Sequence, residues 1–325
     1  MLKRQPNPRD AAKMLTHETA GVFTIAATPF DPSGAIDWPS VDRLSDFYRR
    51  CGVSGMTILG VMGEAQKLEA SKAVALTRRI LARANGLPVI VGVTAPGLAA
   101  MRTLAREAMQ LGAAGVMIAP PGTLRTDDQI TGYYRQAVEA IGADVPFVIQ
   151  DYPLNFSVVM TPGVIARIVQ EHPSCVMLKH EDWPGLAKIS ALRGFERDGS
   201  MRPISILCGN GGLFLDFEVA RGANGAMTGY GFPDMLAELV ALAQAGERTR
   251  AHDLFDAHLP LLRYEQQPGN GLAVRKYVLM RRGAIACDAQ RKPAASLSET
   301  DRREIDFLLE RLAGRDRRAE ISQRM

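Results

Sequence analysis

The sequence lacks the cysteine patterns on which disulfide frameworks and zinc sites depend. Its 325 residues contain four cysteines, Cys51, Cys175, Cys208 and Cys287, which lie far apart and form no CxxC pair. No cluster of His, Cys, Asp and Glu has metal-ligand spacing, so we expect no metal and no other cofactor. Cys175 and Cys208 fall inside apolar runs, where a free thiol behaves as a small hydrophobic side chain. This usage fits a reducing compartment, and we predict a cytoplasmic protein.

Long apolar runs and basic stripes are also missing. The first twenty residues carry no apolar core of the signal-peptide type. The longest uncharged run, residues 84–101, is interrupted by Asn85, Pro88 and Pro96, which argues against a membrane span. The net charge is +4, and no interior run of Lys and Arg is interleaved with aromatic residues. We therefore expect a small-molecule partner, with neither nucleic acid nor membrane.

What the chain does contain is an alternation of strand and helix patterns. Short apolar runs bounded by turn residues predict strands at 21–28, 55–59, 87–93, 115–119, 146–150, 175–179, 204–208 and 225–228. Strands alternating with helices indicate a parallel sheet, and eight such units in roughly 210 residues suit a (β/α)8 barrel. A doubly wound open sheet is the alternative, but no GxGxxG or GxxxxGK[ST] fingerprint follows any strand.

The alternation stops after Gly229. Helical patterns at 234–246, 249–264, 270–282 and 299–313 follow with no strand between them. We therefore predict an N-terminal arm (1–20), a barrel (21–233), and a C-terminal helical subdomain with a tail (234–325). Such an appended subdomain is a place where subunit contacts can form.

The predicted strand ends hold one lysine, Lys179, directly after the apolar residues 175–178. Barrel enzymes carry their catalytic residues at these C-terminal strand ends. An apolar pocket lowers the pKa of an amine, because desolvation disfavours the charged form. The neutral amine can then attack a ketone, and the resulting protonated Schiff base withdraws electrons from a nearby bond. Tyr152, at the end of the preceding strand, is placed to move protons. The alternative for an isolated lysine is an ordinary surface ion pair.

Glu181 extends this group, because residues i and i+2 of a strand face the same side. If the strand continues past Lys179, Glu181 shares its side and His180 faces away as a structural residue; otherwise Glu181 is a solvated loop carboxylate. After the second strand, Gly60 and Gly63 bracket a turn whose N–H groups can hold a carboxylate, although such a turn is often only a turn. Two further strand-end residues are candidates for substrate binding: Asn210 and Thr228.

From about Gly21 to about Pro293, these residues resemble the dihydrodipicolinate synthase/N-acetylneuraminate lyase superfamily of Schiff-base barrel enzymes. The resemblance rests on Thr28-Pro-Phe, Gly60-Val61-Met62-Gly63-Glu64, Gln150-Asp-Tyr152-Pro, Leu178-Lys179 and Gly222-Ala-Asn-Gly225-Ala-Met-Thr228. It implies that Lys179 forms the Schiff base, that Tyr152 shuttles protons, and that residues 61–62 lie against the carboxylate of a 2-oxo acid. It also implies a homotetramer built from two dimers.

The sequence departs from the family pattern at three places. Val61 and Met62 stand where Ser or Thr hydroxyls are usual, and residues 119–123 lack the tyrosine that a neighbouring subunit usually lends. Ser157 stands where true dihydrodipicolinate synthases hold a second carboxylate with an arginine. These departures argue against a role in lysine biosynthesis.

Segments 179–185, 225–234 and 264–267 are more similar to the 2-keto-3-deoxy sugar acid dehydratases, notably the L-2-keto-3-deoxyarabonate type. Glu181 matches a glutamate that helps to expel a hydroxyl there. However, Asn210 stands where a further acidic residue is expected, and Tyr152 is a residue which that subgroup lacks. We predict a lyase acting on a small 2-oxo acid by aldol cleavage or condensation, with sugar acid dehydration on the same lysine as the alternative.

Two alternative functions, from other classes of protein, remain. A phosphate-binding barrel isomerase would use the loops after strands seven and eight, and residues 209–212 resemble such a grip, but no catalytic carboxylate and histidine pair accompanies it. A non-catalytic barrel that binds a sugar acid would explain the missing hydroxyls, whereas the retained Lys179 and Tyr152 argue against it. The sequence does not specify which 2-oxo acid is used, nor its stereochemistry or pathway.

Overall fold

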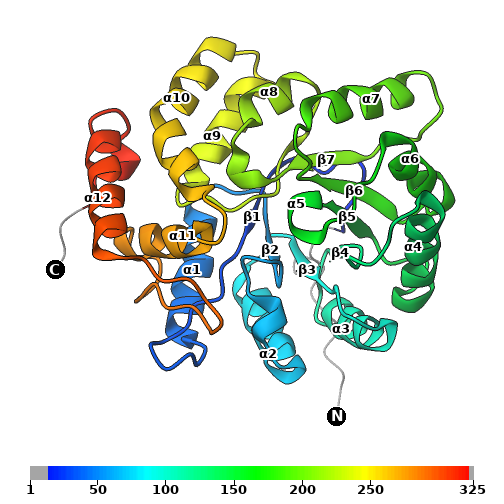
Figure 1. Cartoon of the computed structure of the whole chain (residues 1–325), viewed down its shortest axis with the longest axis horizontal. Helices are drawn as coiled ribbons and strands as arrows, with labels where there is room; N and C mark the ends of the chain where they lie inside the picture. The colour runs from blue at the N-terminus through cyan, green and yellow to red at the C-terminus, as the bar shows by residue number, and fades with distance from the viewer. Residues whose placement is uncertain (1–13, 322–325) are drawn as a thin grey trace.

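The computed structural model describes residues 14–321, which contain a closed barrel of eight parallel strands (Figure 1). The strands follow sequence order around the ring, and the eighth pairs with the first. They are β1 (Gly21–Ile25), β2 (Gly55–Ile58), β3 (Val89–Gly92), β4 (Gly115–Ile118), β5 (Phe147–Asp151), β6 (Cys175–His180), β7 (Ser205–Cys208) and β8 (Gly225–Ala226). Nearly all their residues are buried, as expected for a parallel sheet covered on both faces. The predicted (β/α)8 barrel is confirmed.

Helices surround the barrel. They are α1 (Trp38–Arg50), α2 (Ala70–Arg83), α3 (Leu98–Gln110), α4 (Asp127–Ile141), α6 (Pro162–Glu171), α7 (Leu186–Arg197), α8 (Leu215–Ala220) and α9 (Pro233–Gln244). Local sequence sets their starts: Thr126 and Gln129 form a reciprocal capping box at α4. One short helix was not expected, α5 (Pro153–Phe156) between β5 and α6. Proline suits the first helical position, so this turn begins directly after Tyr152.

The C-terminal part is helical, as predicted, with α10 (Arg248–Glu265), α11 (Gly271–Arg281) and α12 (Glu299–Ala313). These helices lie together beside the barrel, with α12 outermost (Figure 1). Helix α9 packs against β1 and β8 and also against α10, so it links the two parts. The division at residue 233 stays a prediction, and residues 1–13 of the predicted arm and 322–325 of the tail lie outside the described residues. No helix within residues 14–321 is long and apolar enough to cross a membrane.

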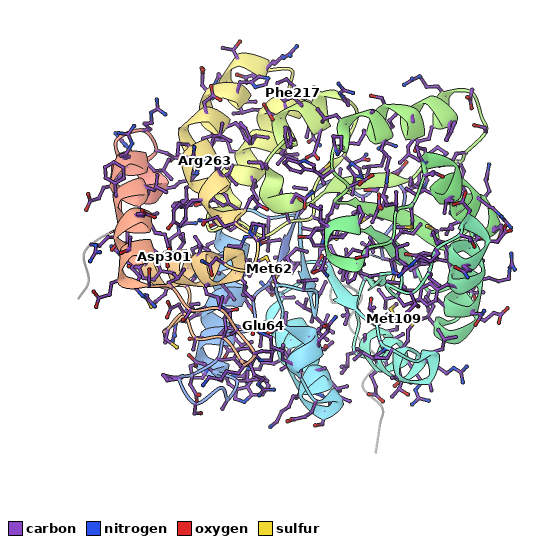
Figure 2. The ribbon with its side chains drawn as sticks, in the orientation of Figure 1. Met62, Glu64, Met109, Phe217, Arg263 and Asp301 are labelled. Atoms are coloured by element: carbon purple, nitrogen blue, oxygen red, sulfur yellow. The ribbon has the colours of Figure 1, made fainter. Side chains whose placement is uncertain are left out.

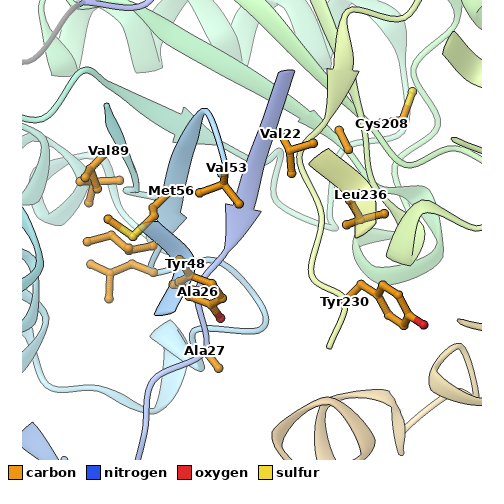
Figure 3. Close-up of a cluster of buried hydrophobic side chains, with 14 of the residues drawn as sticks. Val22, Ala26, Ala27, Tyr48, Val53, Met56, Val89, Cys208, Tyr230 and Leu236 are labelled. Carbon is orange, nitrogen blue, oxygen red and sulfur yellow. The ribbon is translucent and has the colours of Figure 1, made fainter. Parts of the chain in front are cut away.

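The apolar core has two layers, because neighbouring residues of a strand face opposite sides. Val22, Tyr48 and Leu236 belong to the larger cluster between the strands and the helices (Figure 3). Inside the barrel a separate cluster contains Leu15, Phe23, Ile25, Met62, Ile90, Ala114, Met117, Val148, Met177, Leu207 and Met227. Met62 comes from the loop after β2 and joins this inner cluster. The barrel interior below the strand ends is therefore filled with apolar side chains.

Candidate active site

Strand β6 brings Lys179 and Glu181 together at the C-terminal end of the barrel. The backbone N–H of Glu181 still donates to the carbonyl of Asp151 (2.8 Å), so the pairing with β5 continues past Lys179. Lys179 is 4% exposed and Glu181 6% exposed, and Nζ of the lysine lies 2.8 Å from Oε2 of the glutamate. Both side chains therefore face the same side, the relation that the i, i+2 spacing predicts.

Two amides hold Glu181 in place. Nε2 of Gln150 donates to Oε2 of Glu181 (2.8 Å), and Nδ2 of Asn210 donates to its backbone carbonyl (3.0 Å). Gln150 is buried and was not predicted as a site residue. Its signal was present in the sequence, because it is the last residue of the predicted strand 146–150 and so lies at the C-terminal strand ends where a barrel carries its site. The side-chain N–H of Asn210 is used by the carbonyl of Glu181. Its predicted contact with substrate stays a prediction.

Tyr152 stands between the end of β5 and the start of α5. Its ring packs edge-on against Phe156, with the ring centroids 6.1 Å apart. Burial raises the pKa of Tyr152, and the negative charge of Glu181 raises it further, while Arg275 opposes both. The phenol is therefore protonated at neutral pH. It can give a proton to a reacting oxygen and recover one in the same step, but it is a poor free base.

The loop at residues 60–63 offers backbone donors. Within residues 14–321, the N–H groups of Val61, Met62 and Gly63 donate to no other residue. The carbonyl of Gly63 accepts a hydrogen bond from the hydroxyl of Thr28 (2.7 Å), which fixes the turn. The side chain of Val61 is 46% exposed, whereas Met62 is buried. A carboxylate bound here would meet N–H groups and an apolar wall.

The same loop is anchored to the C-terminal helices through Glu64, which Figure 2 labels together with Met62. Glu64 is buried and accepts hydrogen bonds from Lys276 on α11 (2.5 Å) and from Lys67 (2.8 Å). Burial lowers the pKa of Lys276, an effect that the charge of Glu64 opposes. Sequence reasoning assigned no role to Lys276. Its contact with Glu64 ties the candidate carboxylate loop to a helix more than 200 residues away along the chain.

A second group from the C-terminal helices was also missed. Nε of Arg275 donates to Oε2 of Glu265 (3.0 Å), and the N–H of Gly231 donates to the other oxygen of that carboxylate (3.4 Å). Glu265 is fully enclosed, and burial raises its pKa to about 7 although Arg275 opposes the rise. Gln266 follows directly and lies against Gly211, in the loop after β7.

The remaining candidates are placed as follows. Thr228 is buried after β8, and its carbonyl accepts the N–H of Ile25 (2.9 Å). His180 faces away from Lys179: its Nε2 lies 3.1 Å from the carbonyl of Gly185, between the barrel and its helices. In the described part of the chain, no three His, Cys, Asp or Glu side chains gather as metal ligands would.

Comparison with known proteins agrees with this geometry. Residues 18–312 match the dihydrodipicolinate synthetase family. The chain belongs to that family. This membership confirms the resemblance noted in the sequence and shows an enzyme of the class I aldolase and dehydratase type.

Individual members of the family carry different names. An L-2-keto-3-deoxyarabonate dehydratase from Azospirillum brasilense is 31% identical over 90% of this chain and 94% of its own. A 4-hydroxy-tetrahydrodipicolinate synthase from Chlorobium chlorochromatii is 27% identical over 90% of this chain and 97% of its own. The crystal structure of a dihydrodipicolinate synthase from Rhodopseudomonas palustris superposes with a TM-score of 0.91, at 65% identity over 92% of this chain and 99% of that one. The fold is therefore shared closely, while the relatives act on more than one substrate.

Proposed function

We propose that the chain is a lyase that binds a small 2-oxo acid and forms a Schiff base through Lys179. The observation that carries the proposal is the buried pair of Lys179 and Glu181, with 2.8 Å between nitrogen and oxygen, at the C-terminal end of β6. The turn at residues 60–63 supplies free N–H groups for the carboxylate of the substrate. Lys179 is 4% exposed, so an imine formed there is shielded from water.

The first half of the reaction follows from this arrangement. Lys179 passes a proton to Glu181, and the neutral amine attacks C2 of the 2-oxo acid to form a carbinolamine. Tyr152 donates a proton to the departing oxygen, which leaves as water, and the protonated imine remains. The positive imine nitrogen then accepts the electron pair of the bond that breaks.

Aldol cleavage or condensation is the reaction that we place first. Tyr152 supports it, because after its phenol has given a proton to the departing water it can take one back from the substrate hydroxyl that becomes a carbonyl when the carbon–carbon bond breaks. Dehydration of a 2-keto-3-deoxy sugar acid is the second candidate. It is favoured by the position of Glu181 beside the lysine and by the 31% identity to the Azospirillum dehydratase.

Trapping with sodium borohydride in the presence of pyruvate tests the proposal. We expect a reduced adduct of one pyruvate per chain, mapped to the peptide that contains Lys179. Reaction products from longer 2-oxo acids, analysed by mass, then separate aldol cleavage from loss of water. If neither pyruvate nor any longer 2-oxo acid leaves an adduct, the lyase proposal is wrong and a non-catalytic sugar-acid-binding barrel takes its place.

Assembly and location complete the proposal. We propose a homotetramer of two dimers and a cytoplasmic site of action, which are typical expectations for this family. The native mass of the trapped sample tests the assembly, because a tetramer has four times the 35.3 kDa of one chain. A native mass of one or two chains would contradict it.

A further inference from the structure

Two side chains of the C-terminal part meet over the loop that follows β7. Gly211 in this loop has a φ of +69°, and its α-carbon faces the side chains of Gln266 and Arg275. A Cβ placed on Gly211 would lie 3.2 Å from Nη2 of Arg275 and would collide with Nε2 of Gln266. The two nitrogen donors therefore flank the same point of the loop, and only glycine leaves room for them.

Both donors lack an acceptor within residues 14–321. The Nε of Arg275 is occupied by Glu265, whereas neither of its Nη atoms donates to any described residue. Nε2 of Gln266 is buried and has no partner there. A buried donor is almost always satisfied in a folded protein, so Nε2 of Gln266 indicates an acceptor that comes from outside the chain, and Nη2 of Arg275 flanks the same point of the loop.

These two donors lie near the strand that carries the candidate lysine, Lys179. Gly211 follows Asn210, whose amide holds the backbone of Glu181. The charge of Arg275 acts on Tyr152, where it opposes the rise in pKa. In the ring of strands, β7 is the neighbour of β6, which carries Lys179, whereas the loop at residues 60–63 follows β2 on the other side. A substrate held at that loop and at Lys179 has its far end free to turn toward β7.

We propose that Arg275 and Gln266 bind an oxygen-bearing group at the end of the 2-oxo acid distal from its carboxylate. This inference rests on the proposed lyase function. It assigns the enzyme to 2-oxo acids longer than pyruvate that end in hydroxyl groups or in a second carboxylate. The planar guanidinium offers two Nη groups in a fixed fork, which suits either acceptor. Glu265 is a positioning residue that holds Nε and leaves the Nη atoms free.

This assignment also explains how the site manages without the arginine that is missing after Tyr152. Ser157 occupies that sequence position, on the other side of α5. Arg275 is 13% exposed and already paired on one edge, so its guanidinium is held before the substrate arrives. A preordered donor loses little conformational freedom on binding, which favours selectivity for the substrate that presents the matching acceptor.

The test compares substrates of different length on Arg275→Met, Arg275→Lys and Gln266→Leu. Trapping rates are measured with pyruvate, with a hydroxyl-terminated 2-keto-3-deoxy sugar acid and with a 2-oxo dicarboxylic acid. We expect the preference for one of the longer acids over pyruvate to fall roughly 10- to 100-fold in Arg275→Met. Gln266→Leu, which keeps the Arg275–Glu265 pair, is expected to show a smaller fall of the same sign. The acid whose preference falls identifies the acceptor as hydroxyl or carboxylate.

Arg263→Met is the matched control, because this arginine is exposed on α10 and is labelled in Figure 2 away from Met62. It is expected to keep the wild-type preference. An unchanged preference in both Arg275→Met and Gln266→Leu overturns the inference, while pyruvate trapping by the wild type leaves the lyase function standing. No trapping by the wild type with any 2-oxo acid overturns the lyase function first, and this inference with it. Should Arg275→Met fail to fold, Arg275→Lys and Gln266→Leu decide the matter.

Discussion

A buried lysine lies against each face of strands β5 and β6. The two lysines differ in the number of carboxylate groups that contact them. On the inner face, Lys179 has one carboxylate, Glu181, at 2.8 Å. On the outer face, Lys188 of α7 lies 2.8 Å from Asp151 and 2.6 Å from Asp182. The exposed fractions of the two lysines are similar, 4% and 8%. Burial therefore does not distinguish the proposed nucleophile from the lysine on the outer face, whereas the number of carboxylate partners does.

The alternation of a single pair of strands produces both arrangements. Gln150 pairs in register with Lys179, and Asp151 pairs with His180. Successive side chains point to opposite faces, so one face receives Lys179 and the other receives Asp151. Lys188 has two carboxylate partners, the arrangement of a structural ion-pair network. Lys179 has one, which also accepts a hydrogen bond from Gln150.

Substituting each lysine in turn is expected to give the largest difference between the two faces. In Lys179→Met we expect no borohydride adduct and a loss of turnover of roughly 10³-fold or more, because no other amine replaces the nucleophile. In Lys188→Met we expect the adduct to form still. That variant loses about 3–5 kcal/mol of unfolding free energy, because the charge of buried Asp151 is left uncompensated. Peptide mapping and urea denaturation measure the two effects.

The contrast fails if a folded Lys188→Met protein forms no adduct, or if Lys179→Met forms one elsewhere on the chain. The first result would mean that Lys188 takes part in the chemistry, and the second that Lys179 is not the required nucleophile. Circular dichroism of both variants is the control for folding.

Tyr152 offers a test confined to the inner face. Its hydroxyl donates to no residue among 14–321, so Tyr152→Phe is expected to change stability little. Turnover is expected to fall roughly 10²- to 10⁴-fold, the usual contribution of a positioned proton donor, while the adduct of pyruvate still forms, more slowly than in the wild type. Steady-state kinetics and trapping are measured on the same sample. Tyr264→Phe is the control, because that hydroxyl donates to Glu304 on α12 (2.8 Å), in the C-terminal helical part. If Tyr152→Phe keeps turnover within threefold of the wild type, the hydroxyl of Tyr152 is not the proton donor of the reaction.

The barrel and the inner pair could be predicted from the sequence because both depend on local periodicity. Apolar runs place the strands, and the i, i+2 rule places Glu181 beside Lys179. Lys276 and Arg275 could not be found in this way. Their roles depend on where α11 packs, and the contact between Lys276 and Glu64 joins residues 212 positions apart. No periodic pattern in either segment encodes that distance, since it follows from the closure of the barrel and the docking of the helix.

The outer face also holds a carboxyl group whose protonation should affect stability. Glu218 of α8 is 8% exposed, and burial raises its pKa from 4.5 to about 7, although the charge of His180 opposes the rise. The folded protein thus holds this proton more tightly than the unfolded chain. Its contribution to stability is full below about pH 4.5 and is lost as the pH rises to about 7, by roughly 3 kcal/mol at most.

Glu218→Gln should remove this dependence, because glutamine has no proton to lose. Urea denaturation at about pH 5 and about pH 8 is expected to show a smaller loss of unfolding free energy in the variant than in the wild type. Buried Glu265 is present in both proteins and cancels in the comparison. Exposed Glu310→Gln on α12 is the control and should keep the wild-type difference. If Glu218→Gln keeps that difference as well, burial of Glu218 does not set the pH dependence, and the contrast between the two faces rests on the two carboxylates beside Lys188 alone.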